Sequence, residues 1–332
     1  METILILSHS ACHPRQTRFY LELSNHFDLV AVIGPRSWNR SKLSIQDMTF
    51  DKYLIRGLPV SNEMNLELFR FQALEQVVSS LNKTFDYVYV QDEWWSRTAQ
   101  DALALARKLN AKAILFTWEN IRIPEPEQVK HFDFIIAGNI EAGGNLIAGG
   151  YPSKKIAFLP QVGIDTFLFS PKPVKKEFDV VFAGRPVVEK GIQIIQEGCA
   201  KIGARLLILC DLDYEQVPER LSSAHIFASL PMATQTWKEQ CGYAALEAMA
   251  CGLPVITTNS GSVLDYMDPN IAMIIPESWA KDHFAGACKD FLAVKNSARF
   301  CQRSQEGRDY VCANYSNLII AKEVADAIKA IS

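Results

Sequence analysis

The sequence predicts an α/β protein that consists of two Rossmann-like domains facing each other across a cleft. Short apolar or β-branched runs alternate with helical patterns almost throughout the chain, which is typical of βα units around parallel sheets. The length of 332 residues is long for one doubly wound sheet and comfortable for two. Hydrophobic residues make up 48% of the chain, so each half can bury a core of its own.

The first half, residues 1–165, is predicted to be the amino-terminal domain. Its apolar runs predict strands at 3–8, 29–34, 87–91, 113–117, 134–137 and 156–159. Its helical patterns predict helices at 16–26, 66–81, 97–109 and 141–148. Ligands of parallel sheets bind beyond the carboxyl ends of the strands, so the loops that follow these strands are where a site is expected.

The second half, residues 166–315, repeats this rhythm as a carboxy-terminal domain. Strands are expected at 179–183, 206–209, 226–229, 255–258 and 272–275, and helical patterns run from Trp279 to the end of the chain. A linker is expected at 163–176, because this stretch contains Pro171, Pro173 and three lysines without a clear apolar period.

Composition excludes several classes of function. The formal net charge is −3 and the chain has no basic tract, which argues against a nucleic-acid-binding surface. The eight cysteines form no C-x-x-C pair and no zinc spacing, so we expect free thiols in a reducing cytoplasm. The sequence shows no signal peptide and no apolar stretch of membrane-spanning length. We expect a cytoplasmic protein and leave open peripheral contact with the inner face of a membrane.

Two glutamates in the segment 238–256 indicate a binding site. Glu239 lies in a loop that enters an alanine-rich helix, and Glu247 lies about one turn inside that helix. The first turn of a helix offers backbone N–H groups and the positive end of the helix dipole to an anion. Carboxylates beside such a pocket are suited to accept hydrogen bonds from hydroxyl groups carried by the anion. The segment therefore predicts a site for a sugar phosphate.

Two cations follow the first strand of the second half. Gly184 ends this strand, Arg185 lies in the turn, and Lys190 lies where the next helix begins. Arginine offers a planar fork to phosphate oxygens and lysine a mobile point charge, so together they can neutralise a diphosphate without a metal. The alternative is a solvated Arg and Lys on the surface. The segment contains no Walker P-loop motif.

These motifs, in this order and spacing, resemble the retaining glycosyltransferases of family 4 (group 1), which have the GT-B fold. The resemblance rests on Gly184-Arg185 with Lys190-Gly191, on Glu239 and Glu247 with seven residues between them, and on the segment 247–255. The segments 149–152 and 158–171 also resemble the approach to the family's linker, with Gln161 where asparagine is usual. The likeness is strong from about residue 132 to 260 and weak before about residue 85.

The resemblance implies a nucleoside-diphosphate-sugar donor held mainly by the carboxy-terminal domain. Arg185 and Lys190, after Gly184, would bind the diphosphate; Glu239 would bind hydroxyls of the transferred sugar, and Glu247 the ribose. Backbone N–H groups near Cys241, Gly242 and Tyr243 would complete the phosphate site. The cations and the helix N-terminus would stabilise the charge that grows on the leaving diphosphate.

The family's reaction proceeds with retention of anomeric configuration and without a dedicated nucleophile. The resemblance also implies that the nucleotide sugar is a substrate and that no cofactor and no metal are needed. The expected partners are therefore the donor and a hydroxyl acceptor on a glycan, a lipid or a small molecule. The donor base, the donor sugar, the acceptor and the oligomeric state are left open.

The acceptor side departs from the family pattern. Where family members carry a histidine after an amino-terminal-domain strand, this chain has Glu119. Our hypothesis is that Glu119 takes over part of that polar role, as a member of the catalytic set with Arg185, Lys190 and Glu239. The alternative is a loop carboxylate that makes a local salt bridge. Glu93 lies at a neighbouring strand end and is either an acceptor-side residue or an N-cap for the helix that starts near Ser96.

The loop after the first strand contributes two further acceptor-side candidates, His9 and His13. With Cys12 they could suggest a metal site, but three ligands on one loop without a distant fourth are thin support. Asp211 and Asp213 resemble a metal-binding D-x-D pair, which arises easily by chance after a strand. We therefore expect no metal.

The last segment, residues 316–332, has an amphipathic helical stripe. In GT-B proteins the final helix often crosses back onto the amino-terminal domain, and the resemblance implies the same packing here. Two alternatives to the transferase are kept. One is a nucleotide-sugar epimerase of the same fold, which would act without an acceptor. The other is a non-catalytic GT-B protein that binds a nucleotide.

Overall fold

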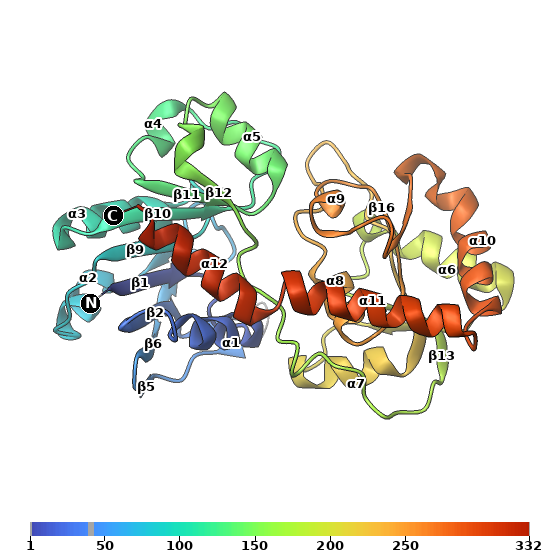
Figure 1. The fold of residues 1–332 in the computed structure, drawn as a ribbon. Coiled ribbons are helices and arrows are strands. Elements are labelled where there is room, and N and C mark those ends of the chain that lie inside the picture. The colour runs from blue at the N-terminus through green and yellow to red at the C-terminus, as the bar shows by residue number, and fades with distance from the viewer. Residues whose placement is uncertain (1, 39–42, 332) are drawn as a thin grey trace. The chain divides into compact units, whose positions relative to one another are not determined.

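The computed structural model describes residues 2–38 and 43–331, which form two compact units (Figure 1). The first unit comprises the described residues up to Gly163 together with those from Asn317 onward, and the second comprises Ile164–Ser316. The last helix, α12 (Asn317–Lys329), thus belongs to the first unit, where it packs against α1 (Pro14–Leu23). No helix in the described part of the chain is long and apolar enough to cross a membrane.

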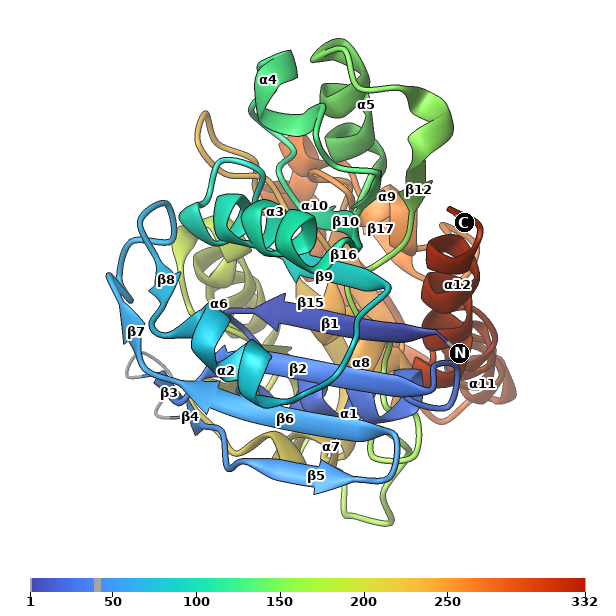
Figure 2. The ribbon, with the colours of Figure 1, turned by 90° about the vertical axis from the view of Figure 1, so that its left-hand side faces the viewer.

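The first unit is built around a sheet with the strand order β12-β11-β10-β9-β1-β2-β6-β5 (Figure 2). All neighbours in it pair in parallel except β5 and β6. Its strands are β1 (Thr3–Ser8), β2 (Leu29–Pro35), β5 (Met48–Phe50), β6 (Tyr53–Leu58), β9 (Tyr87–Gln91), β10 (Lys112–Thr117), β11 (Phe134–Ala137) and β12 (Ile156–Phe158). Two further strand pairs are antiparallel: β3 (Ser37–Trp38) with β4 (Leu43–Ser44), and β7 (Val60–Ser61) with β8 (Arg70–Phe71).

Chain order reverses in this sheet between β1 and β9. The strands β2 and β6 extend to one side of β1, whereas β9, β10, β11 and β12 extend to the other. Such a topological switch point opens a crevice at the carboxyl ends of the two central strands. The helices of the unit are α1, α2 (Leu74–Ser80), α3 (Arg97–Leu109), α4 (Pro126–Val129), α5 (Ile140–Ala148), the 3₁₀ turn η1 (Ser153–Lys155) and α12.

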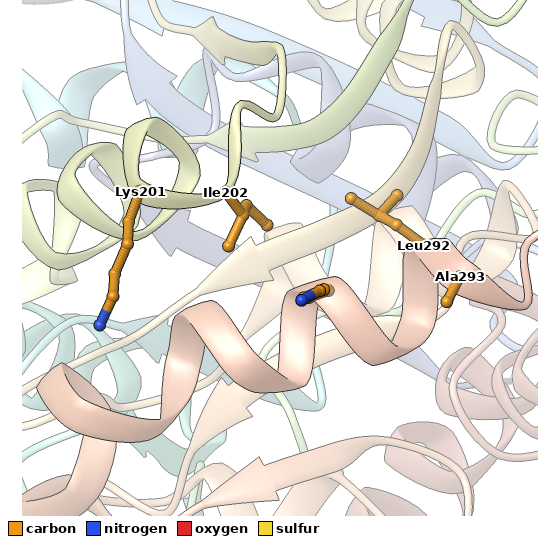
Figure 3. Close-up of a pocket in the computed structure, with 5 residues that line it drawn as sticks. Lys201, Ile202, Leu292 and Ala293 are labelled. Carbon is orange, nitrogen blue, oxygen red and sulfur yellow. The ribbon is translucent and has the colours of Figure 1, made fainter.

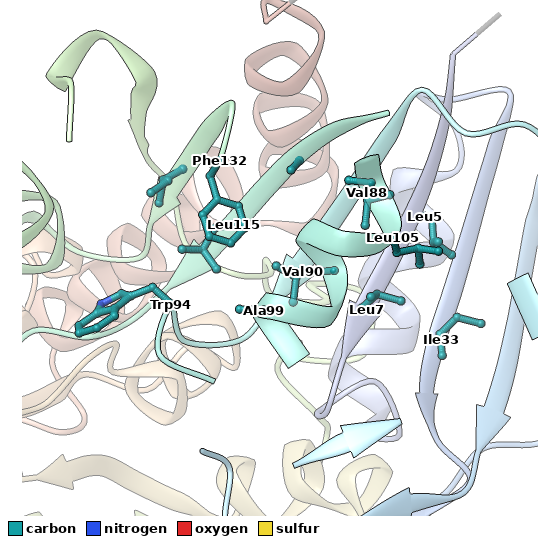
Figure 4. Packing of buried hydrophobic residues seen from close by; sticks show 14 of the residues in the cluster. Leu5, Leu7, Ile33, Val88, Val90, Trp94, Ala99, Leu105, Leu115 and Phe132 are labelled. Carbon is teal, nitrogen blue, oxygen red and sulfur yellow. The ribbon is translucent and has the colours of Figure 1, made fainter. Parts of the chain in front are cut away.

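The core of the first unit lies between the sheet and its helices (Figure 4). Leu5 of β1 pairs in register with Ala31 of β2 and Val88 of β9, and all three are buried. Leu105 of α3 packs into the same cluster. Helices on both faces explain why the central strands read as nearly continuous apolar runs rather than as alternating ones.

The second unit contains a parallel sheet with the order β14-β13-β15-β16-β17. Its strands are β13 (Phe178–Ala183), β14 (Leu206–Leu209), β15 (Ala224–Ser229), β16 (Val255–Thr258) and β17 (Met273–Ile275). Its helices and 3₁₀ turns are η2 (Val188–Lys190), α6 (Ile192–Ile202), η3 (Tyr214–Gln216), α7 (Val217–Ser222), α8 (Tyr243–Ala250), α9 (Val263–Tyr266), η4 (Glu277–Trp279), α10 (Ala280–Ala293) and α11 (Ala298–Asn314). Here the chain order reverses between β13 and β15, which is the switch point of this sheet.

The α/β class with parallel sheets is as the sequence predicts, and most predicted strands agree with the observed ones within one or two residues. The helix predicted at 66–81 is wrong in its first half. The structure has strand β8 there and begins α2 only at Leu74, after Ala73 adopts a left-handed backbone with φ of 56°. The strands β5 and β6 were not predicted. The linker residues from Ile164 onward belong to the second unit, where Ile164 forms a parallel bridge to Ser316.

Candidate functional site

The strongest candidate site lies at the switch point of the second unit. The loop after β13 carries Gly184, Arg185 and Lys190, and the loop after β15 carries Glu239. Because β13 and β15 are hydrogen-bonded neighbours, both loops leave the same edge of the sheet side by side. Residues far apart in the sequence thus come together where a doubly wound sheet binds its ligands.

Lys190 and Glu239 form an ion pair in this crevice. The Lys190 Nζ lies 2.5 Å from Glu239 Oε2, and the side chains are 22% and 8% exposed. The same ammonium lies 5.0 Å from the centre of the Trp237 ring, within the range of a cation–π contact. A half-buried cation, a buried carboxylate and an aromatic face thus meet at one point.

Two glycines explain how the first loop reaches the second. Gly184 has φ of 135°, a backbone conformation that side chains other than glycine rarely adopt, and it turns the chain directly after β13. Gly191 has φ of 66°, and a Cβ there would lie 2.2 Å from the carbonyl oxygen of Leu230. Only glycine allows this approach, so Gly191 brings Lys190 against the end of β15.

Glu239 is held by the loop that follows β16. The backbone N–H of Ser262 donates to the carbonyl oxygen of Glu239 at 2.9 Å. Gly261, at φ of 55°, lies so close to Glu239 that a Cβ would come within 2.4 Å of its carbonyl oxygen. The backbone position of Glu239 therefore depends on a third strand end.

Glu247 lies in the second turn of α8 and is 4% exposed. Its Oε1 accepts a hydrogen bond of 2.9 Å from the hydroxyl of Tyr214, which comes from η3. The N-cap of α8, Gly242, has no side chain to cap the first turn, and Tyr243 begins the helix beside the buried Cys241. Arg185 is exposed in the same loop as Lys190. The motifs revealed neither Trp237, which lies against Lys190, nor Tyr214, which bonds Glu247.

In the first unit, the Glu119 carboxylate accepts hydrogen bonds from its own loop and from a nearby tryptophan. Its Oε1 accepts hydrogen bonds from the backbone N–H groups of Ile121 at 3.1 Å and Arg122 at 3.0 Å, and its Oε2 accepts one from the Trp95 indole at 3.2 Å. The Arg122 Nε lies 3.9 Å from Oε2. Both oxygens thus have local partners, which favours the local salt-bridge alternative over an acceptor-side role.

Glu93 joins two strand ends rather than capping a helix. Its carboxylate accepts hydrogen bonds from the hydroxyl of Thr117 and from the backbone N–H of Trp118 at 3.0 Å. The N-cap of α3 is Ser96, whose hydroxyl accepts from Ala99 N–H, so the N-cap interpretation of Glu93 is wrong. Burial raises the pKa of Glu93 to about 7.

The two histidines of the first loop have different environments. His13 is the N-cap of α1, and its Nδ1 accepts a hydrogen bond of 3.1 Å from the backbone N–H of Arg15. Burial, aided by the charge of Arg15, lowers the pKa of His13 to about 4, so it is neutral at pH 7. The Nδ1 of His9 lies 3.7 Å from Oδ2 of Asp92, a residue that the sequence did not single out.

The described part of the chain contains no cluster of three or more potential metal ligands. A hollow of about 490 Å³ lies between α6 and α10, lined by Lys201, Ile202, Lys289, Leu292 and Ala293 (Figure 3). Because α6 starts just after Lys190 and ends near Lys201, this hollow lies at the opposite edge of the sheet from the Lys190–Glu239 pair. It is not part of the site.

Comparison with known proteins identifies the second unit. Residues 175–308 match the model of the family Glycosyl transferases group 1. The chain carries a group 1 glycosyltransferase domain. This domain includes Gly184, Arg185, Lys190, Glu239 and Glu247, the residues that the sequence placed at the donor.

One similar curated protein is phosphatidyl-myo-inositol mannosyltransferase from Propionibacterium freudenreichii subsp. shermanii. It is 29% identical over 164 residues, which are 48% of this chain and 41% of the relative. The matched region thus spans about two fifths of the relative's length.

Solved structures show that the glycosyltransferase domain is part of a GT-B fold. Sucrose-phosphate synthase from Thermosynechococcus elongatus aligns with a TM-score of 0.76 at 15% identity, over 100% of this chain and 99% of that one. The Anabaena protein Alr3699/HepE, in complex with UDP and glucose, aligns with a TM-score of 0.69 at 12% identity, over 99% and 100% of the two chains. The facing of the two domains across a cleft stays a prediction.

Proposed function

We propose that the chain is a retaining, metal-independent glycosyltransferase that moves a sugar from a nucleoside-diphosphate sugar to a hydroxyl acceptor. The observation that carries the proposal is the contact between Lys190 and Glu239. It joins the cation expected at the diphosphate to the carboxylate expected at the sugar, at the switch point of a parallel sheet and within a group 1 glycosyltransferase domain.

Donor binding would separate the Lys190–Glu239 pair and give each side chain a new partner in the donor. The Lys190 ammonium turns from Glu239 to oxygens of the diphosphate, and the Glu239 carboxylate becomes an acceptor for sugar hydroxyls. As the anomeric C–O bond breaks, negative charge grows on the diphosphate and the sugar becomes oxocarbenium-like. Lys190, Arg185 and the N-terminus of α8 stabilise that change, which is strongest in the transition state.

Neutralisation by protein groups supports metal independence. Two cationic side chains and a helix N-terminus supply positive charge where other transferases use a divalent ion. The donor is consumed as a substrate, so the proposal includes no cofactor. Retention of configuration rests on the family resemblance alone.

The acceptor class is proposed as a hydroxyl on a glycan, a lipid or a small molecule. The curated relative is named for phosphatidyl-myo-inositol, which makes an inositol lipid a sensible acceptor to test. With a lipid acceptor the protein would work in the cytoplasm, peripherally at the inner face of the membrane.

The test is a panel of UDP-, GDP-, ADP- and dTDP-sugars with myo-inositol, phosphatidylinositol vesicles and octyl glucoside as acceptors. The proposal predicts nucleoside diphosphate release that depends on acceptor, an unchanged anomeric configuration by NMR, and activity that survives EDTA. Conversion of the donor sugar without acceptor would identify an epimerase instead. Failure to bind or turn over any nucleotide sugar refutes the transferase, and loss of activity in EDTA that Mn²⁺ restores refutes metal independence.

A further inference from the structure

Two cysteines meet between α6 and α10 in the second unit. Cys199 on α6 is 2% exposed and Cys288 on α10 is 0% exposed, and both belong to the same hydrophobic cluster. Both are free thiols, and the two thiols are hydrogen-bonded to each other. A pair of buried thiols in direct contact is the arrangement from which a disulfide can form.

A glycine lets the two helices approach closely at this point. A Cβ on Gly198 would lie 2.5 Å from Cδ1 of Phe284 and 3.7 Å from Cβ of Ala285. Cys199 is the next residue after Gly198, and Cys288 lies about one helical turn after Phe284. The thiol contact thus lies where the backbone of α6 packs against α10, so the packing of the helices fixes it.

The hollow between α6 and α10 lies next to the thiols (Figure 3). Ile202 follows Cys199 by three positions and Leu292 follows Cys288 by four, spacings that place both on the same helix faces as the thiols. Both side chains are partly buried and line the hollow of about 490 Å³. They belong to the last turns of the two helices, and helix ends open more readily than helix centres. A small solute in the hollow can therefore reach the thiols when these last turns open.

We propose that Cys199 and Cys288 form a reversible disulfide when hydrogen peroxide oxidises the protein, and that this bond crosslinks α6 to α10. The Cys199 thiolate attacks one peroxide oxygen, and the O–O bond breaks to give a sulfenic acid and, with one proton, a water molecule. The Cys288 sulfur then attacks the sulfenic sulfur. The S–O bond breaks, the S–S bond forms, and the hydroxide leaves with the Cys288 proton as a second water molecule. Two thiols are thus oxidised while one peroxide is reduced to two waters.

The contact gives the two thiols different roles. The hydrogen bond between them lowers the pKa of Cys199 and raises the pKa of Cys288, whereas burial opposes ionisation of both. The thiolate is the reactive form of cysteine, so Cys199 is the group that attacks the peroxide. Cys288 keeps its proton until it attacks the sulfenic acid.

The crosslink would close a loop around most of the second unit's sheet. The residues between the two cysteines include β14, β15, β16, β17 and α8, with Glu239 and Glu247. A disulfide that closes a long loop restricts the unfolded chain strongly. Because the thiols already touch, their sulfurs need to approach only over a short distance. Oxidation should therefore stabilise the unit that carries the candidate site, and this inference does not depend on the transferase function.

The test starts from the folded wild-type protein. It is treated with hydrogen peroxide, quenched, denatured in an alkylating agent and digested for mass spectrometry. We expect a linked pair of peptides that contain Cys199 and Cys288, which dithiothreitol separates. The melting temperature of the oxidised protein should rise by about 5 °C or more and return to its original value in dithiothreitol.

Cys199→Ala and Cys288→Ala should each lose the crosslink and the rise in melting temperature. Cys301→Ser, at an exposed cysteine of α11, is the matched control and should keep both. Dimedone, which labels sulfenic acids, should modify Cys199 in Cys288→Ala, and the reverse pattern would overturn the assignment of roles.

Peptide mapping of the wild type decides the inference even where an alanine variant does not fold. Oxidation of the exposed Cys301 while Cys199 and Cys288 remain free thiols overturns the proposal. A 199–288 crosslink without a rise in melting temperature refutes its stabilising effect.

Discussion

Replacement of Lys190 by methionine isolates the charge of the Lys190–Glu239 pair, because methionine keeps most of the stem that lies over Trp237. At the observed 2.5 Å, two unit charges attract by roughly 7 kcal/mol when the effective dielectric constant is about 20. Desolvation of both groups offsets most of this attraction, so the pair itself adds little to folding. The variant, however, leaves a carboxylate that is 8% exposed without its cation.

Loss of one partner of a buried pair costs about 3–5 kcal/mol. The Lys190 side chain is 22% exposed, so water can approach the carboxylate and the lower end applies. We expect Lys190→Met to lower the free energy of unfolding of the second unit by about 3 kcal/mol, or the melting temperature by about 6–12 °C for a unit of this size. The double variant Lys190→Met/Glu239→Gln should recover most of that stability, because the buried carboxylate that lost the Lys190 cation is replaced by a neutral amide.

Urea denaturation of the two single variants and the double variant measures the coupling, for which we expect about 2 kcal/mol or more. Thermal shift with UDP and GDP measures the donor site, and both Lys190 variants should lose the nucleotide-dependent shift. Lys201→Met, at an exposed lysine on α6, is the matched control and should behave as wild type. Wild-type stability together with a wild-type nucleotide response in Lys190→Met refutes the reasoning.

Three further predictions test other groups. Folding raises the pKa of Glu93 from 4.5 to about 7, so the folded state holds this proton more tightly than the unfolded state. The free energy of unfolding should therefore fall by roughly 3 kcal/mol as the pH rises from about 4.5 to about 7. If urea denaturation of Glu93→Gln shows the same pH dependence, the group that causes it is not Glu93. Glu119→Gln retains an acceptor for the loop amides and should keep kcat within about threefold of wild type, whereas a hundredfold loss would restore its acceptor-side role. Tyr214→Phe removes the 2.9 Å hydrogen bond to Glu247 and should weaken nucleotide binding by up to about tenfold, which is about 1.4 kcal/mol. Calorimetry measures this change, and an unchanged Kd excludes Tyr214 as a residue that positions Glu247.

The sequence predicts correctly those strands that are buried on both faces. β1 and β9 are continuous apolar runs in the sequence because helices cover both sides of the sheet, and their bounds agree with the prediction. β6 was missed because Arg56 and Gly57 interrupt its apolar run, and its identity as a strand depends on parallel pairing with β2. No local sequence pattern indicates which distant strand β6 pairs with.

The helix predicted at 66–81 failed for a related reason. Its apolar spacing is compatible with a helix, but Arg70 and Phe71 pair with Ser61 and Val60 in a hairpin. Pairing over this distance is decided by tertiary contacts, which override local propensity. Only the part from Leu74 onward, beyond the left-handed Ala73, forms a helix.

The same division between local pattern and distant contact applies to the candidate residues. Lys190 and Glu239 could be singled out from the sequence because each belongs to a motif with its own glycine and helix signals. His9 was a candidate only as a polar residue of the loop after the first strand, and Asp92 was not singled out at all. Strand order brings the ends of β1 and β9 together, and strand order follows from how the chain crosses over the sheet rather than from either loop. Residues at the ends of strands that flank a switch point are therefore the ones to compare with the structure first, because the fold can bring them together without any sequence motif.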